Sequence, residues 1–123
     1  MKVLIVEDDT FFQKFYANKL KDTGFSVDVA ANGEEGLEKI NQGKPDIVLL
    51  DIVMPKKDGF EVLQTISQNP ELKKIPVLVF SSLGQEQDVQ RAISLGAVGF
   101  VNKSFFDFDQ LLVKIFAVIN RLE

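Results

Sequence analysis

The stretch PDIVLLDIVMPKKDG, from Pro45 to Gly59, is the part of the sequence on which the fold prediction depends. It contains four consecutive apolar residues, Ile47 to Leu50, a pattern typical of a strand buried on both faces of a parallel sheet. Asp51 follows this run directly. Open α/β sheets bind their ligands beyond the carboxyl ends of the strands. A carboxylate at this position therefore either caps the strand or belongs to a functional site.

Strands and helices alternate in the patterns on either side of this stretch. Apolar runs predict three further strands, at Lys2 to Glu7, Val77 to Phe80 and Ala97 to Val101, and the alternating pattern of Ser26 to Ala30 predicts an edge strand. Helical spacing predicts five helices: from Thr10 to a stop at Gly24, from Glu34 to Asn41, from Gly59 to Ser67, from Gln85 to Leu95, and from Asp107 or Asp109 through Arg121. Gly43 is expected to close the second of these helices, and Asp58 to be the N-cap of the third. This alternation predicts βαβ units with right-handed crossovers around a central parallel sheet.

Composition and charge exclude several classes of protein. The 123 residues fit a single domain, residues 1–123, and the 46% of hydrophobic residues is ordinary for a globular fold. The net charge of -4 argues against direct binding to nucleic acid, because phosphate contacts need a basic face. The chain has no apolar run long enough for a membrane span, an N-terminus too acidic for a signal peptide, and neither cysteine nor histidine to bind zinc. We expect a cytoplasmic protein that does not contact the membrane.

Four of the five predicted strands end in a chemically useful side chain. Glu7 and Asp8 end the first strand, Asp51 follows the third, Ser81 the fourth and Lys103 the fifth. In a parallel sheet these groups converge on one edge, where clustered carboxylates repel one another unless a cation binds. Mg²⁺ prefers such oxygen ligands. A carboxylate beside Mg²⁺, with a lysine and a hydroxyl opposite, suits phosphoryl transfer to the carboxylate itself.

These residues, in this order, resemble the receiver domain of two-component response regulators. The acidic pair, LLDIVMPKKDG, the hydroxyl and the lysine follow the first, third, fourth and fifth strands, and the resemblance covers essentially all 123 residues. The resemblance implies a doubly wound, flavodoxin-like (βα)5 fold. Its parallel sheet would have five strands in the order 2-1-3-4-5, with helices on both faces.

The resemblance also implies roles for the acidic residues. Asp51 is expected to be the phosphoacceptor and a Mg²⁺ ligand, together with Asp8 and the backbone carbonyl of Val53. Glu7 is expected to bind the ion through water. Val53 and Leu83 flank the expected phosphoryl group, and because both are apolar we predict that they hinder an attacking water and prolong the life of the phosphorylated form.

Three further positions follow from the same resemblance. Ser81 is expected to hydrogen-bond to the phosphoryl group and Lys103 to pair with it. Phe100 lies where the family has an aromatic residue that turns inward on activation. The chain departs from the family at Ser104, where a proline in a cis peptide bond is usual. A cis bond before a non-proline residue costs about 2.5–4 kcal/mol, so we expect a trans bond between Lys103 and Ser104.

The resulting hypothesis is a phosphorylation-dependent switch rather than an enzyme in its own right, although it would assist its own phosphorylation and dephosphorylation. A sensor histidine kinase or phosphotransfer protein would phosphorylate Asp51. The fourth helix, fifth strand and fifth helix would then contact a downstream protein or a second copy of the chain. The phenylalanine-rich stretch from Phe105 to Phe108 fits either an exposed part of that surface or a thickly packed helix edge.

Three other functions compete with this hypothesis. A degenerate receiver that binds partners without phosphorylation would explain Ser104 and Phe100, whereas Asp51 and Lys103 argue against it. A flavodoxin-like electron carrier needs a hydroxyl-rich loop after the first strand, where this chain has the acidic VEDDT. A phosphohydrolase with an aspartate nucleophile would place two aspartates, two residues apart, after that strand. The sequence is compatible both with a stand-alone regulator and with one domain of a larger regulator, and we expect a stand-alone regulator.

Overall fold

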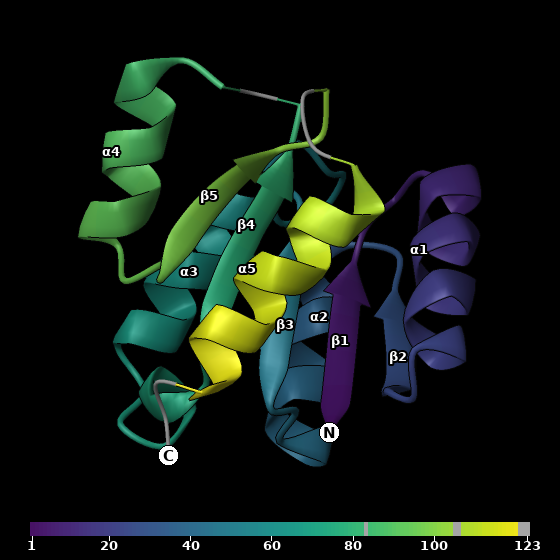
Figure 1. Cartoon of the computed structure of the whole chain (residues 1–123). Helices are drawn as coiled ribbons and strands as arrows, with labels where there is room; N and C mark the ends of the chain where they lie inside the picture. Colours follow the sequence, from purple (N-terminus) through teal and green to yellow (C-terminus); the bar gives the residue numbers. More distant parts are fainter. Residues whose placement is uncertain (83, 105–106, 121–123) are drawn as a thin grey trace.

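Five parallel strands form the centre of the computed structural model, which describes residues 1–82, 84–104 and 107–120 (Figure 1). They are β1 (Lys2–Val6), β2 (Ser26–Ala30), β3 (Ile47–Leu50), β4 (Val77–Ser81) and β5 (Gly99–Asn102). Their order across the sheet is β2-β1-β3-β4-β5, and every neighbouring pair is parallel. The predicted fold class and the strand order 2-1-3-4-5 are therefore confirmed.

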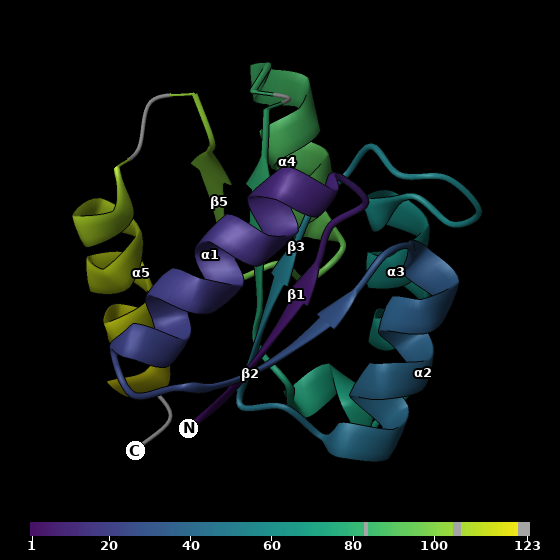
Figure 2. The same cartoon turned by 90° about the vertical axis from the view of Figure 1, so that its right-hand side faces the viewer.

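Helices cover both faces of this sheet (Figure 2). The described residues form α1 (Thr10–Asp22), α2 (Gly33–Gly43), α3 (Gly59–Ser67), α4 (Glu86–Ser94), α5 (Phe108–Asn120) and a short 3-10 helix, η1 (Leu72–Lys74). Figure 2 shows α1 and α5 on one side of the sheet and α2 and α3 on the other. None of the helices in the described part of the chain is long and apolar enough to span a bilayer.

The sheet divides the hydrophobic core into two halves. Leu4 and Val6 of β1 face α2, α3 and α4, where they pack with residues such as Ile40. Val3 and Ile5 point to the opposite face and pack against α1 and α5. Because both faces of the central strands β1, β3 and β4 are covered, each contains an unbroken run of four apolar residues rather than an alternating pattern. The apolar runs that result from burial on both faces are what allowed the central strands to be predicted from the sequence.

Side chains at the helix starts satisfy free backbone N–H groups, as N-caps do. The side chain of Asp58 accepts a hydrogen bond from the N–H of Glu61, and the Glu61 side chain accepts one from the N–H of Asp58, so the predicted N-cap of α3 is confirmed. Asp9 caps α1 in a similar way, through the N–H of Phe12. At α5, the side chain of Asp107 accepts from the N–H of Gln110, which settles the choice between Asp107 and Asp109.

Some of the predicted ends of helices and strands were wrong, because local backbone conformation and hydrogen bonds place these ends at other residues. Helix α2 extends through Gly43, which was expected to lie beyond its end, and its C-cap is Lys44, which has a left-handed backbone (φ 44°). Strand β5 begins at Gly99 rather than Ala97, since the N–H of Ala97 still bonds to the carbonyl of Ala92 in α4. Ser81 belongs to β4 instead of following it.

The C-terminal helix leaves apolar side chains on the surface. Val113 and Phe116 of α5 are exposed, which favours an exposed patch over a thickly packed edge for the described part of this helix. Phe105, Phe106 and the predicted helix end at Arg121 lie outside the described residues.

Candidate phosphoacceptor site

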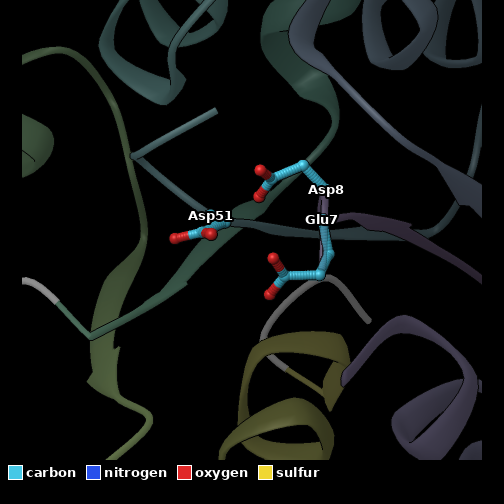
Figure 3. A group of neighbouring side chains, drawn as sticks. All are labelled: Glu7, Asp8 and Asp51. Atoms are coloured by element: carbon cyan, nitrogen blue, oxygen red, sulfur yellow. The ribbon is translucent and has the colours of Figure 1, made fainter. Parts of the chain in front are cut away.

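Three carboxylates meet at the C-terminal edge of the sheet (Figure 3). Glu7 and Asp8 follow β1 and Asp51 follows β3, and these two strands are neighbours. One oxygen from each side chain lies within 4.8 Å of the others. Glu7 and Asp51 are buried whereas Asp8 is exposed to solvent. A set of carboxylate oxygens this close together, with one open side, fits a divalent cation such as Mg²⁺.

Lys103 brings a positive charge to the same edge. The backbone N–H of Lys103 donates a hydrogen bond to the backbone carbonyl of Ser81 at 3.0 Å, and this bond fixes the end of β5 beside the end of β4. Its Nζ contacts a carboxylate oxygen of Glu7 and lies 3.4 Å from Oδ2 of Asp51. All three side chains are at most 10% exposed. The lysine therefore bridges two buried carboxylates that would otherwise repel each other.

Glu7 has an unusual titration in this setting. Burial raises the pKa of Glu7 to about 7, and repulsion from Asp51 acts in the same direction. The hydrogen bond and charge of Lys103, and the backbone N–H of Asp9, oppose this rise. A carboxyl group with this pKa is partly protonated near neutral pH, and a bound cation would favour its ionised form.

The two oxygens of Asp51 have different surroundings. Oδ1 accepts a hydrogen bond from the N–H of Ile52 at 2.8 Å, whereas Oδ2 is the oxygen near Lys103. The loop after β3 returns to this point, where the N–H of Gly59 donates to the carbonyl of Ile52 at 2.8 Å. A Cβ at Gly59 would lie only 2.5 Å from the carbonyl oxygen of Asp51. Only glycine fits this contact, which packs the start of α3 against the end of β3.

A solvent-open cavity of about 420 Å³ lies over the three carboxylates. Val53, 60% exposed, and Ser82 are part of its wall. The full lining consists of Glu7, Asp8, Asp9, Phe12, Asp51, Val53, Ser82, Lys103 and Ser104.

The structure brings together most of the predicted site residues, but not all of them. Ser81 is fully buried and does not line the cavity, whereas Ser82 does. The sequence analysis did not predict Ser82 as a site residue, although two neighbouring serines, Ser81 and Ser82, stand at the end of β4 and either hydroxyl could have faced the site. Phe100 is half-buried and packs on the sheet face that carries α2, α3 and α4. Leu83 lies outside the described residues.

The loop after β5 has the expected backbone. The described residues contain no cis peptide bond, so the bond between Lys103 and Ser104 is trans, as predicted. The N–H of Ser104 donates to the side chain of Asn102 at 2.8 Å. This contact stabilises the turn that follows Lys103 in the absence of the usual proline.

A doubly wound sheet with an acidic cluster and a buried lysine at its C-terminal edge defines an α/β protein whose strand ends carry a group of carboxylates that could hold a cation. The sequence matches the family model described as response regulator receiver domain over residues 3–116. The chain therefore belongs to the receiver domain family of two-component signalling.

Relatives in this family include regulators of transcription and an enzyme. The chain is 35% identical to the probable transcriptional regulator ycf29 of Porphyra purpurea, over 97% of this chain and 56% of the relative. It is 32% identical to the DNA-binding dual master transcriptional regulator RpaA of a Synechocystis strain, over 99% of this chain and 50% of the relative. It is 43% identical to a protein-glutamate methylesterase/protein-glutamine glutaminase of Oleidesulfovibrio alaskensis, over 94% of this chain and 31% of the relative. The chain thus spans about half or less of the length of these relatives.

Solved structures share the whole fold. The receiver domain of the Francisella response regulator 1452 has a TM-score of 0.91 at 26% identity, over 99% of this chain and 98% of that one. The Vibrio cholerae chemotaxis protein CheY4 has a TM-score of 0.88 at 29% identity, over 95% of this chain and 97% of that one.

Proposed function

We propose that this chain is the phosphorylation-dependent switch of a two-component system, in which Asp51 accepts a phosphoryl group from a sensor histidine kinase or a phosphotransfer protein. The observation that carries the proposal is the placement of Asp51 Oδ2. This oxygen lies beside a solvent-open cavity, within 3.4 Å of the Lys103 ammonium and next to an acidic cluster that fits Mg²⁺. The same site assists phosphorylation and dephosphorylation of the chain itself, and the proposed place of action is the cytoplasm.

The chemistry divides between the two oxygens of Asp51. Oδ1 is held by the N–H of Ile52, so Oδ2 is the nucleophile that forms the bond to phosphorus while the bond from phosphorus to the donor breaks. Lys103 offsets negative charge on the transferred group. Asp8, Asp51 and the carbonyl of Val53 would hold Mg²⁺, with Glu7 acting through water. The ion would neutralise charge on the phosphoryl oxygens.

Signalling then depends on the ends of β4 and β5. Ser81 pairs with Asn102 in the sheet, and Phe100 lies two residues before Asn102. The hydroxyl of Ser81 would hydrogen-bond to the phosphoryl group. Because Ser81 is fully buried, this bond requires the end of β4 to shift, which frees Phe100 to turn inward.

The partner surface of the proposed switch comprises α4, β5 and α5. Apolar side chains are exposed on it or beside it, namely Ile93, Val98, Val113 and Phe116. A downstream protein or a second copy of this chain would bind there, without direct contact to nucleic acid or membrane. The shift at β4 and β5 biases this surface between two states.

Incubation with acetyl phosphate and Mg²⁺, followed by intact mass measurement, tests the proposal. The wild-type chain is expected to gain the mass of one phosphoryl group, and EDTA is expected to prevent the gain. Asp51→Asn should gain nothing, because its amide is not a nucleophile. If the wild-type chain gains no mass, the switch is excluded and the degenerate receiver becomes the better description.

We further predict that the phosphorylated form is long-lived. Val53 lines the cavity with an apolar, largely exposed side chain that offers no hydrogen bond to an attacking water. Val53→Asn should shorten the lifetime several-fold, measured as mass loss after acetyl phosphate is removed. Val113→Asn, at a similarly exposed position on α5 (70%, against 60% for Val53), is the control and should not change the lifetime. Loss of the phosphoryl group from the wild-type chain within seconds would contradict the prediction.

A further inference from the structure

Two aromatic rings enclose the ammonium group of Lys103 together with the carboxylates. Its Nζ lies 5.1 Å from the ring centroid of Phe12 and 5.7 Å from that of Phe80. Phe12 comes from α1 and Phe80 from β4, so the rings approach the lysine from two separate elements. Both distances are within the range in which a ring face attracts a cation.

Tyr16 connects these two rings. It stacks on Phe12, with ring centroids 6.1 Å apart and an angle of 7° between the planes. It also meets Phe80 edge-on, with centroids 4.9 Å apart and an angle of 88°. Tyr16 and Phe80 are buried, whereas Phe12 is half-buried and lines the cavity over Asp51. We call Phe12, Tyr16 and Phe80 the aromatic bracket.

The bracket suits an ammonium group that must change partners. In the structure Lys103 contacts Glu7 more closely than Asp51. A phosphoryl group on Asp51 adds negative charge there and attracts the lysine away from Glu7. A hydrogen-bond acceptor would hold the ammonium in one direction, whereas a ring face attracts it over a broad area. The rings can therefore keep the ammonium at the site throughout this movement.

The contacts also oppose the escape of the lysine to solvent. The Lys103 side chain is only 9% exposed, and a buried ammonium group needs compensation for its lost hydration. Glu7 supplies part of this compensation at rest and loses that role when the lysine moves. The ring faces of Phe12 and Phe80 matter most during the move, when the ammonium has left Glu7 and has not yet reached the phosphoryl group, so they lower the barrier to transfer.

Building on the proposed function, we propose that Phe12 and Phe80 are positioning residues for phosphoryl transfer, whose ring faces hold the Lys103 ammonium inside the site as it moves from Glu7 to the phosphorylated Asp51.

Substitutions at Phe12 test the proposal by the rate of phosphorylation with acetyl phosphate and Mg²⁺. Phe12→Leu keeps an apolar side chain but removes the ring face, and should slow phosphorylation by about three- to tenfold, the range that a cation–π contact supports. Phe12→Tyr keeps the face and should restore the wild-type rate. The matched control is Phe11→Leu, the same change one residue earlier, at a ring that is 71% exposed. A wild-type rate for Phe12→Leu would overturn the proposal.

A double-mutant cycle separates positioning of Lys103 from a general structural effect. In a Lys103→Met background, Phe12→Leu should cause no further slowing, because the group on which the ring acts is absent. If Phe12→Leu slows the Lys103→Met variant by the same factor as the wild type, the ring does not act through the lysine and the proposal fails.

NMR of the lysine side chains gives a measurement that does not depend on phosphorylation. Ring currents should shift the Lys103 side-chain methylene signals away from those of the exposed lysines, and Phe12→Leu should reduce this shift while Phe11→Leu does not. Ordinary Lys103 signals in the wild type would exclude the bracket. A wild-type chain that gains no phosphoryl group would instead contradict the proposed function, and these spectra would still decide whether the bracket exists.

Discussion

Glu7→Gln is expected to stabilise the folded protein by about 2–3 kcal/mol at about pH 8, and by much less at about pH 5, when no Mg²⁺ is present. Burial raises the pKa of Glu7 from 4.5 in the unfolded chain to about 7 in the folded one. The folded state thus holds the proton more tightly. Its stabilising contribution is complete below the unfolded pKa and is lost as the pH rises through the folded pKa.

Glutamine mimics the protonated form of Glu7 at every pH, so the variant does not lose this contribution. The measurement is the free energy of unfolding in urea, with EDTA, across this pH range. Glu38→Gln, at an exposed position in α2, is the control and should follow the wild-type pH dependence. Equal stability of Glu7→Gln and the wild type at about pH 8 would show that Glu7 ionises in the folded protein without a penalty.

Gly59→Ala is expected to lower the free energy of unfolding by about 1–3 kcal/mol, the usual cost of overpacking, and to slow phosphorylation as well. The added Cβ would lie 2.5 Å from the carbonyl oxygen of Asp51 and 2.7 Å from the Cα of Ile52. Both neighbours are backbone atoms, so relief requires a shift of the end of β3 or of the start of α3. Either shift displaces the Asp51 carboxylate from Lys103.

Gly43→Ala provides a matched comparison for this substitution. Its Cβ would also have a close neighbour, at 2.6 Å, but that neighbour is the Nζ of Lys2, the free end of a flexible side chain. The lysine can move aside, so the higher helix propensity of alanine should leave the free energy of unfolding unchanged or raise it by up to about 1 kcal/mol. Urea unfolding of both variants checks the difference. A Gly59→Ala variant as stable as Gly43→Ala would mean that the end of β3 is not tightly packed.

Much of the fold was predictable because its determinants are local. Ile47 to Leu50 is apolar at each position since both faces of β3 are covered, and this covering is a direct consequence of helices on both sides of a parallel sheet. Asp58 and Glu61 form their cap within a single turn of the chain. The convergence of Glu7, Asp8, Asp51 and Lys103 also followed from order along the chain, because parallel strands place all their carboxyl ends at one edge.

Three-dimensional packing was needed for what each side chain does at that edge. Order along the chain could not show that Ser82 rather than Ser81 lines the cavity, since that depends on the turn of the backbone at the last residue of β4. Nor could it pair Lys103 with Glu7, 96 positions away, and with the ring of Phe12. The spacing of apolar residues along the sequence indicates which face of a helix or strand is buried. The direction of a side chain at the end of a strand depends instead on contacts with other helices and strands, which only the tertiary structure shows.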